Sequence, residues 1–183
     1  MPVIHHKFQD YQPDPNTEIL ILGTFVPEQD GSQDFFYGRT RNFLWHLLPQ
    51  CWGLEPLKEA PLVQKEQFMS NYNIDFADII RSLEVPEGEE LNSDDAFIDS
   101  HVSEWRNIRA LIDTLPLLKA VYFTKKTFNG VPFMRDQVKS ISAHCASKNI
   151  RFCKLETPSK FYSPEKLQQW IDTVVLKTTC LRV

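Results

Sequence analysis

Short apolar segments that alternate with longer helical segments constrain the fold of this chain more than any other feature. Residues 18–22 (EILIL) form an apolar run that ends at Gly23, which is typical of a buried parallel strand followed by a turn. Three further strands are predicted at residues 74–80 (IDFADII), 119–124 (KAVYFT) and 151–156 (RFCKLE).

Helical segments separate these predicted strands. Apolar residues recur at helical spacing in residues 42–48, where Pro49 ends the run, and in residues 62–72. Further helices are predicted around residues 98–115, at 131–147 and at 164–176, the last with a proline in its first turn. The alternation predicts an α/β fold, a three-layer α/β/α sandwich with a central, mostly parallel four-stranded sheet.

Nothing in the sequence divides the chain into parts. The 183 residues, 42% of them apolar, contain no repeats and no low-complexity linker, so we expect one domain over residues 1–183. Residues 2–17, with three prolines, are expected to form an irregular N-terminal arm. Residues 84–99 hold seven acids and no Lys or Arg, which predicts a solvated loop.

Composition restricts the compartment and the cofactors. No apolar run reaches the ~18 residues of a transmembrane helix, and the first residues lack a signal-peptide core, so we expect a cytoplasmic protein with no membrane partner. No two cysteines have the spacing of a metal site, so we expect reduced thiols and neither a metal nor a cofactor. The cysteines are Cys51, Cys145, Cys153 and Cys180.

The segment after the first strand holds candidate ligand-binding residues, because open α/β sheets bind ligands at the carboxyl ends of their strands. The aromatic residues 35–37 (FFY) either pack in the core or form a flat wall for a planar ligand. Arg39 and Arg41 form either a phosphate site or a solvated turn, and Asn42 is suited to cap the next helix. The patterns of a P-loop and of a dinucleotide-binding loop are absent.

This region resembles the uracil-DNA glycosylase superfamily, most closely its mismatch-specific and hypoxanthine-DNA glycosylase branches. Those branches carry an apolar strand, a Gly-x-x-Pro turn and an aromatic-Tyr-x-x-x-x-Asn-x-Phe-Trp block. Here residues 19–22 resemble the strand, residues 23–27 (GTFVP) the turn with one residue extra, and residues 36–45 (FYGRTRNFLW) the block, with Leu44 replacing its Phe. Residues 155–159 (LETPS) occupy the place of the family's second motif, a Pro-Ser loop after the last strand.

The resemblance implies an enzyme of base-excision repair that flips a damaged base out of DNA and hydrolyses its N-glycosidic bond. Such a reaction needs a positioned water, hydrogen-bond donors toward the base and an aromatic wall. Many family members place a polar residue inside the first turn, whereas this chain has Phe25 and Val26 there, as the hypoxanthine branch has apolar residues. The asparagine of the block is catalytic in that branch, so the resemblance implies that Asn42 is the catalytic residue.

The resemblance also implies roles for the other candidate residues. Tyr37, and next Phe36, would stack on the base, while backbone amides of residues 23–25 would donate to its edge. Ser159 would contact a phosphate, and Phe161 or Tyr162 would either fill the gap left by the flipped base or pack at the start of the last helix. The candidates are Gly23, Thr24, Phe25, Phe36 and Tyr37 for base binding, and Arg39, Arg41, Ser159, Lys160, Phe161 and Tyr162 for DNA binding.

Three functions fit these patterns. The first is a monomeric DNA glycosylase whose partner is DNA with a deaminated base, uracil or hypoxanthine. The second is a relative without strong catalysis that binds a nucleobase, a nucleotide or damaged DNA, which the substituted turn and the altered second motif favour. The third is an unrelated α/β protein whose aromatic block belongs to the core.

The distribution of charge leaves room for a DNA partner on an acidic protein. The net charge is −4, from 20 basic and 24 acidic residues, but without the seven acids of residues 84–99 the balance is 20 against 17. Residues 119–166 hold ten Lys and Arg against three acids. Together with Arg39 and Arg41, these residues predict a local basic face.

Overall fold

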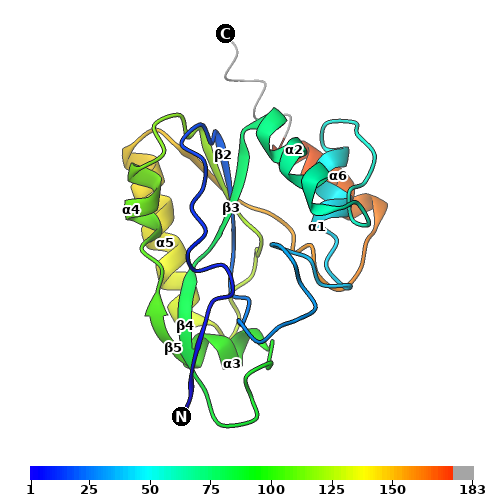
Figure 1. Ribbon diagram of the computed structural model, residues 1–183. Helices are drawn as coiled ribbons and strands as arrows, with labels where there is room; N and C mark the ends of the chain where they lie inside the picture. Colours follow the sequence, from blue (N-terminus) through cyan, green and yellow to red (C-terminus); the bar gives the residue numbers. More distant parts are fainter. Residues whose placement is uncertain (175–183) are drawn as a thin grey trace.

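The computed structural model describes residues 1–174, and at their centre lies a parallel sheet of four strands (Figure 1). The strands follow the order β3 (Ile74–Asp78), β2 (Ile19–Gly23), β6 (Ala120–Phe123) and β7 (Arg151–Lys154). Each neighbouring pair is parallel, so the predicted sandwich is confirmed with a central sheet that is parallel throughout.

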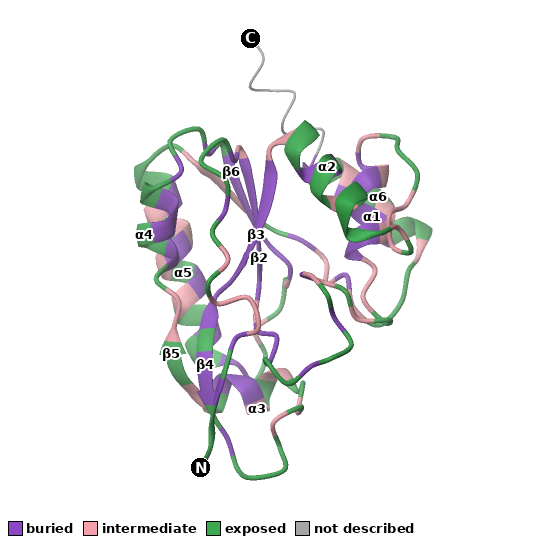
Figure 2. Ribbon diagram, in the orientation of Figure 1, coloured by how far each residue is buried: buried purple, intermediate pink, exposed green. Residues whose placement is uncertain are grey.

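Helices cover both faces of this sheet. α1 (Leu44–Gln50), α2 (Leu62–Tyr72) and α6 (Pro164–Val174) lie on one side, and α4 (Ile108–Asp113) and α5 (Pro132–Ser147) lie on the other (Figure 1). Figure 2 shows β2, β3 and β6 buried between these layers, while the outer helix surfaces are exposed. The edge strand β7 is only partly buried.

The two cores divide the side chains of β2 by alternation, as expected for a strand buried on both faces. Ile19 and Ile21 pack in the core under α1, α2 and α6. Leu20 and Leu22 pack in the core under α4 and α5. All five residues of β2 are buried, which explains why the segment reads as a continuous apolar run.

A second, antiparallel sheet was not predicted. It contains β1 (Val3–His5), β4 (Ile80–Glu84) and β5 (Val102–Trp105) in the order β1-β4-β5. The predicted irregular arm therefore includes a strand, because residues 3–5 pair with β4. The predicted strand 74–80 was wrong as a single element: it breaks at Ile79, whose amide donates to the carbonyl of Gly23, and continues in the other sheet.

The predicted helix around residues 98–115 was also wrong, because tertiary pairing overrides its local helical pattern. Residues 102–105 form β5 against β4, between α3 (Asp95–Ser100) and α4. Side-chain caps from Asp94 and Asn107 start these two short helices separately. The predicted solvated loop 84–99 is mostly exposed over residues 86–94, but residues 95–99 belong to α3, where Asp99 is buried.

Smaller differences concern the ends of elements. α1 begins at Leu44 and includes Pro49 in its last turn, whereas the sequence pattern placed the end before that proline. The last two residues of the predicted final helix, and Cys180, lie outside the described residues. Among residues 1–174, no helix has the length and apolar character needed to cross a membrane.

The central strand should tolerate truncation poorly. Leu20 is fully buried, so Leu20→Ala is expected to lower the free energy of unfolding by about 2–5 kcal/mol through lost burial and a residual cavity. Leu117, which is 48% exposed, provides the matched control, and Leu117→Ala should change stability by about 0.5 kcal/mol or less. Urea unfolding followed by circular dichroism measures both. Equal losses in the two variants would contradict the central position of β2.

Candidate functional site

A close polar cluster lies at the carboxyl edge of the parallel sheet. Gly23 ends β2 and pairs in register with Asp78, which ends β3. Thr124 directly follows β6, and its Oγ1 donates to the carbonyl of Leu22 at 3.1 Å. A Cβ on Gly23 would clash with Asp78 Oδ1 and lie 2.7 Å from the hydroxyl oxygen of Tyr37. Only glycine therefore allows both groups to approach the end of β2.

Tyr37 reaches this edge from the loop after β2. Its φ of 59° lies in the left-handed region, which is unfavourable for a bulky residue and recurs at functional sites. The Tyr37 hydroxyl lies 3.3 Å from Thr124 Oγ1, and its ring centroid lies 5.6 Å from that of Phe76. Burial, and then the charge of Asp78, raise the pKa of Tyr37 well above its usual value, so the phenol is protonated at neutral pH.

His6, from the N-terminal arm, holds Asp78 in place. Its Nε2 lies 2.7 Å from Asp78 Oδ2, and the two side chains are only 2% and 5% exposed. The backbone amide of Phe8 donates to His6 Nδ1 at 3.0 Å, so in the neutral ring the proton is on Nε2 and is donated to Asp78. Sequence reasoning missed this pair because its members are 72 residues apart and neither belongs to a recognisable motif.

The two family-like motifs meet through their backbones. The segment 41–43 runs beside the loop 158–160, and an isolated antiparallel bridge joins Asn42 to Ser159. The loop after β7 is thereby fixed against the start of α1, close to the candidate catalytic asparagine. The bridge is flanked by two hydrogen bonds, from the Phe43 amide to the Pro158 carbonyl at 2.8 Å and from the Lys160 amide to the Arg41 carbonyl at 2.9 Å.

Asn42 lies one residue before the N-cap position of α1, which Phe43 occupies without a side-chain hydrogen bond. Its Oδ1 accepts a hydrogen bond from the amide of Leu44 at 3.0 Å, at the start of α1. The side chain is half-buried, and its Nδ2 donates to no acceptor within residues 1–174. The amide oxygen of Asn42 is thus used within the fold, while its amide donor has no acceptor among the described residues.

Phe36, another of the predicted base-binding residues, lies in the hydrophobic core. Phe36 is fully buried among Phe8, Tyr11 and Phe76, so its ring has no free face, and the expectation that it stacks on a base is corrected to a core role. Trp45 Nε1 donates to the Phe36 carbonyl at 2.8 Å and fixes the backbone beside Tyr37.

The turn after β2 offers backbone groups. The side chain of Phe25 is buried, its ring centroid 5.6 Å from that of His6, and Thr24 is half-buried. The backbone amides of Thr24 and Phe25 donate to no other group in the described part of the chain. These two amides therefore have no acceptor among the described residues.

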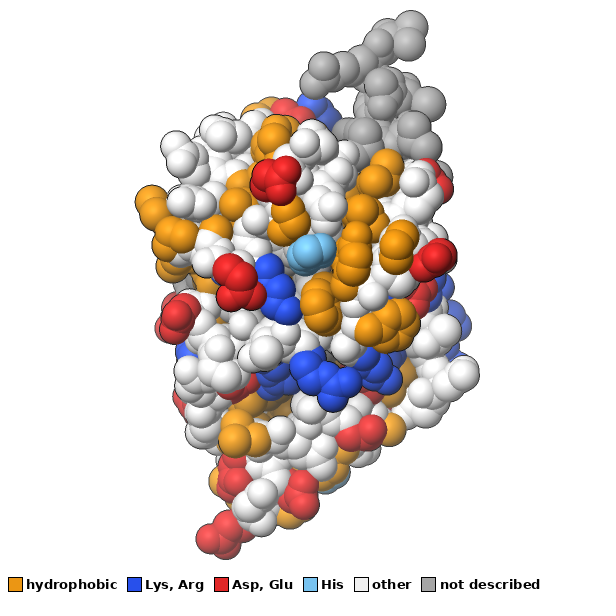
Figure 3. All heavy atoms as spheres, turned by 90° about the vertical axis from the view of Figure 1, so that its right-hand side faces the viewer, with side chains coloured by type: hydrophobic (Ala, Val, Ile, Leu, Met, Phe, Trp, Pro, Cys, Tyr) orange, Lys and Arg blue, Asp and Glu red, His pale blue; other side chains and the backbone are white. Residues whose placement is uncertain are grey.

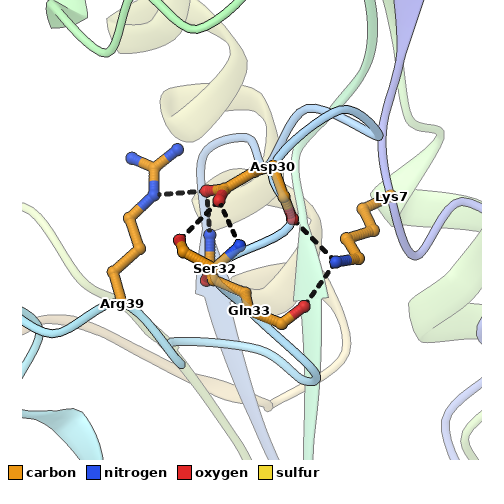
Figure 4. A network of polar contacts seen from close by, with 5 residues as sticks. All are labelled: Lys7, Asp30, Ser32, Gln33 and Arg39. Carbon is orange, nitrogen blue, oxygen red and sulfur yellow. Dashed lines mark hydrogen bonds and ion pairs between the residues drawn. The ribbon is translucent and has the colours of Figure 1, made fainter.

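A network around Asp30 holds the loop that leads to Tyr37 and orients Arg39 (Figure 4). The Asp30 carboxylate accepts from Ser32, from Gln33 Nε2 at 2.8 Å and from Arg39 Nε at 2.8 Å. Lys7 Nζ donates to the backbone carbonyls of Asp30 and Gln33. Burial alone would raise the pKa of Asp30, but these hydrogen bonds outweigh it and hold the pKa well below its usual value.

Arg39 keeps donors free despite this ion pair. Only its Nε bonds to Asp30, and Figure 4 shows the two terminal nitrogens pointing away from the network. Arg41 and Lys160 are exposed beside the bridge, and Lys58 Nζ donates to the Thr40 carbonyl at 2.6 Å. We call Arg39, Arg41, Lys58 and Lys160 the basic rim. Figure 3 shows Lys and Arg side chains in a band across this face of the molecule.

The loop 157–163 rests on a buried lysine that sequence reasoning missed. Lys166 Nζ donates to the carbonyls of Ser159 at 3.3 Å and Phe161 at 2.7 Å, and burial lowers its pKa. The Phe161 ring lies 4.1 Å from this ammonium but is 59% exposed. Tyr162 is 36% exposed and contacts the ring of His46 in α1, whereas Phe161 contacts Lys166 in the first turn of α6.

Many of the remaining basic residues do not extend the rim. Lys119, Lys125 and Lys148 each pair with an acid, namely Glu18, Asp95 and Asp113. Within residues 1–174, no group of three or more His, Cys, Asp or Glu side chains is arranged to hold a metal ion.

The Asp30 network should make stability depend on pH below about pH 4. Asp30 remains ionised in the folded protein at pH values where an unfolded Asp, with a pKa near ~3.9, takes up a proton. The stability it contributes is therefore complete above that value and declines as the pH falls toward the folded-state pKa. We expect Asp30→Asn to lower the Tm by a constant amount from pH 8 to pH 5, and by less below pH 4.

Thermal unfolding across this pH range measures the effect. Asp136→Asn is the matched control, because Asp136 is an exposed residue on α5 whose carboxylate pairs only with Arg135 among the described residues. A Tm difference for Asp30→Asn that grows as the pH falls would contradict the assignment.

Comparison with known proteins identifies the fold but no sequence family. The sequence matches no protein-family model and no curated protein. A structural match is the solution NMR structure of a protein from Methanosarcina acetivorans that is proposed to be a uracil DNA glycosylase. It covers 87% of this chain and 90% of the other, with a TM-score of 0.60 and 18% identity. The chain therefore has a uracil-DNA-glycosylase-like α/β/α fold.

Proposed function

We propose that this protein is a DNA N-glycosylase that removes a deaminated base, uracil or hypoxanthine, from DNA. The observation that carries the proposal is the meeting of both family-like motifs beside the carboxyl edge of the sheet, where Asn42 bridges to Ser159. The fold supports it, because the structural neighbour from Methanosarcina acetivorans is itself proposed to be a uracil DNA glycosylase.

The candidate site has the groups that this chemistry needs. As the glycosidic bond breaks, the base gains negative charge and the sugar becomes an oxocarbenium-like cation. The unpaired amides of Thr24 and Phe25 are suited to donate to the leaving base. The Tyr37 ring is suited to stack on the base, and Asn42 Nδ2 is suited to contact the base or the attacking water.

Binding of DNA is assigned to the basic rim and the loop after β7. Arg39, Arg41 and Lys160 would bind backbone phosphates, and Ser159 would contact the phosphate nearest the flipped nucleotide. The exposed ring of Phe161 would fill the space that the flipped base leaves in the duplex. A basic rim of four cations on a chain with net charge −4 implies that DNA binding is weak and sensitive to salt.

One observation favours a second candidate, a protein that binds damaged DNA without releasing a base. The turn after β2 carries the apolar residues Phe25 and Val26, and the oxygen of Asn42 is already bonded to Leu44. Neither the turn nor the asparagine oxygen is then free to orient a water. Tight binding to an abasic duplex, unchanged by Asn42→Ala and without turnover, would identify this function.

Base release tests the first candidate directly. The purified protein is expected to release uracil or hypoxanthine from a labelled duplex, measured as alkali-sensitive strand cleavage, and Asn42→Ala is expected to abolish release. Asn42→Asp keeps an acceptor for Leu44 while removing the amide donor, so it separates catalysis from the contact that Asn42 makes with the start of α1. Asn129→Ala, at an exposed position, is the control. No release from a broad panel of lesions would contradict the proposed activity.

The basic rim should determine the salt dependence of DNA binding. Arg41→Ala and Lys160→Ala are each expected to weaken duplex binding and to reduce the slope of log K against log salt by about 1. Lys139→Ala removes an exposed cation from α5, on the other face of the sheet, and should leave the slope unchanged. Fluorescence anisotropy at several salt concentrations measures all three. Equal slopes in every variant would exclude the rim from the interface.

A further inference from the structure

Asp78 has a largely buried side chain, and only one of its two carboxylate oxygens accepts a hydrogen bond from the described residues. Its side chain is 5% exposed, and Oδ2 accepts from His6, but Oδ1 accepts no hydrogen bond from any residue that the structure describes. Oδ1 lies against Gly23, at the position that a Cβ would fill, and beside the hydroxyl of Tyr37. No buried side-chain nitrogen or oxygen among the described residues lacks a hydrogen-bond partner, so Oδ1, which has none, keeps contact with solvent and is open to a water or a ligand.

The negative charge of Asp78 is not neutralised by its partner. Since His6 Nδ1 accepts from the amide of Phe8, the ring is a neutral donor and the pair keeps a net charge of −1. Two other titratable groups act on Asp78, the protonated phenol of Tyr37 and, from the segment before α4, the guanidinium of Arg106. Arg106 donates to the Tyr11 carbonyl and forms no ion pair with Asp78.

The residues assigned to the base and to the water supply no negative charge. The turn after β2 offers Phe25 and Val26, and Asn42 is uncharged. An oxocarbenium-like sugar is stabilised by a fixed carboxylate, and the effect is greatest in a buried site where water does not screen the charge.

We infer that the Asp78 carboxylate faces the sugar of the flipped nucleotide and is a catalytic residue. This inference rests on the proposed function. As the bond between C1′ and the base nitrogen breaks, its electron pair leaves with the base and Asp78 stabilises the sugar cation. The oxygen of a water then bonds to C1′, and the proton of that water passes to Asp78 Oδ1 and afterwards to solvent or to the departed base.

His6 acts through Asp78 as a positioning residue. Its Nε2–H fixes Oδ2, which leaves Oδ1 directed at the edge where Gly23 and Tyr37 lie. It is not a proton relay, because the Phe8 amide already occupies Nδ1. A donor at this position, rather than an imidazole as such, is what the arrangement requires.

Two abasic-site analogues test the charge without needing turnover. One duplex carries a pyrrolidine, which is a cation at neutral pH, and the other a neutral tetrahydrofuran. We expect the wild-type protein to bind the pyrrolidine duplex about tenfold more tightly or better, as a charged transition-state mimic. Asp78→Asn should reduce this ratio to about 1 while tetrahydrofuran binding stays within about threefold of the wild type.

Variants of His6 and of a surface Asp–His pair test whether the pyrrolidine preference depends specifically on Asp78. His6→Phe should lower the pyrrolidine preference, and His6→Gln, which retains an N–H donor, should restore part of it. Asp113→Asn is the matched control, since Asp113 pairs with His144 on the exposed surface at 2.9 Å and should leave the preference unchanged. If Asp78→Asn does not fold, as judged by thermal unfolding, Asp78→Ser removes the same charge with a smaller side chain.

Measurements of base release distinguish a failure of this inference from a failure of the proposed function. With base release established, Asp78→Asn should lower kcat by about 10²–10³-fold with little change in KM. A pyrrolidine preference that depends on Asp78, in a wild-type protein that releases no base, would support the charge assignment and contradict the enzymatic function. No preference in the wild type, or an equal preference in Asp78→Asn, would overturn the inference.

Discussion

The pairing of β2 with β3 on one side and β6 on the other is the constraint on which the rest of the site depends. Because all three strands are parallel and in register, Gly23, Asp78 and Thr124 come together at one edge of the sheet. The absence of a side chain on Gly23 then lets Asp78 and Tyr37 approach the same point. A charge, a phenol and a hydroxyl thus converge where ligands of such folds bind.

The loops around this edge are held by contacts that leave functional groups unpaired. Asp30 binds Arg39 through one nitrogen only, and Lys166 binds the backbone of the 157–163 loop while Phe161 remains exposed. Asn42 likewise uses its oxygen to accept from the Leu44 amide, and its own amide donor has no acceptor among the described residues. The same interactions that order the loops therefore preorganise the candidate site, which lowers the cost of ordering it on binding a ligand.

Charge is separated over the surface. The acidic loop after β4 is exposed near α3, whereas the basic rim surrounds the bridge between Asn42 and Ser159. Several other lysines are paired with acids, so the sum of charges along residues 119–166 overestimates the basic face. The position of the basic rim, rather than the net charge, supports the proposed DNA partner.

The sequence by itself determined the parallel sheet and the location of the candidate site, because both depend on local signals. The apolar run of β2 ends at Gly23, and the aromatic block with Asn42 lies directly after it. Only the tertiary structure decided that β5 interrupts a helical pattern, that Phe36 belongs to the core, and that His6 and Asp78 form a pair. Each of these depends on partners distant in the chain, since strand pairing, burial and the hydrogen bonding of an isolated Asp or His leave no local periodicity to detect.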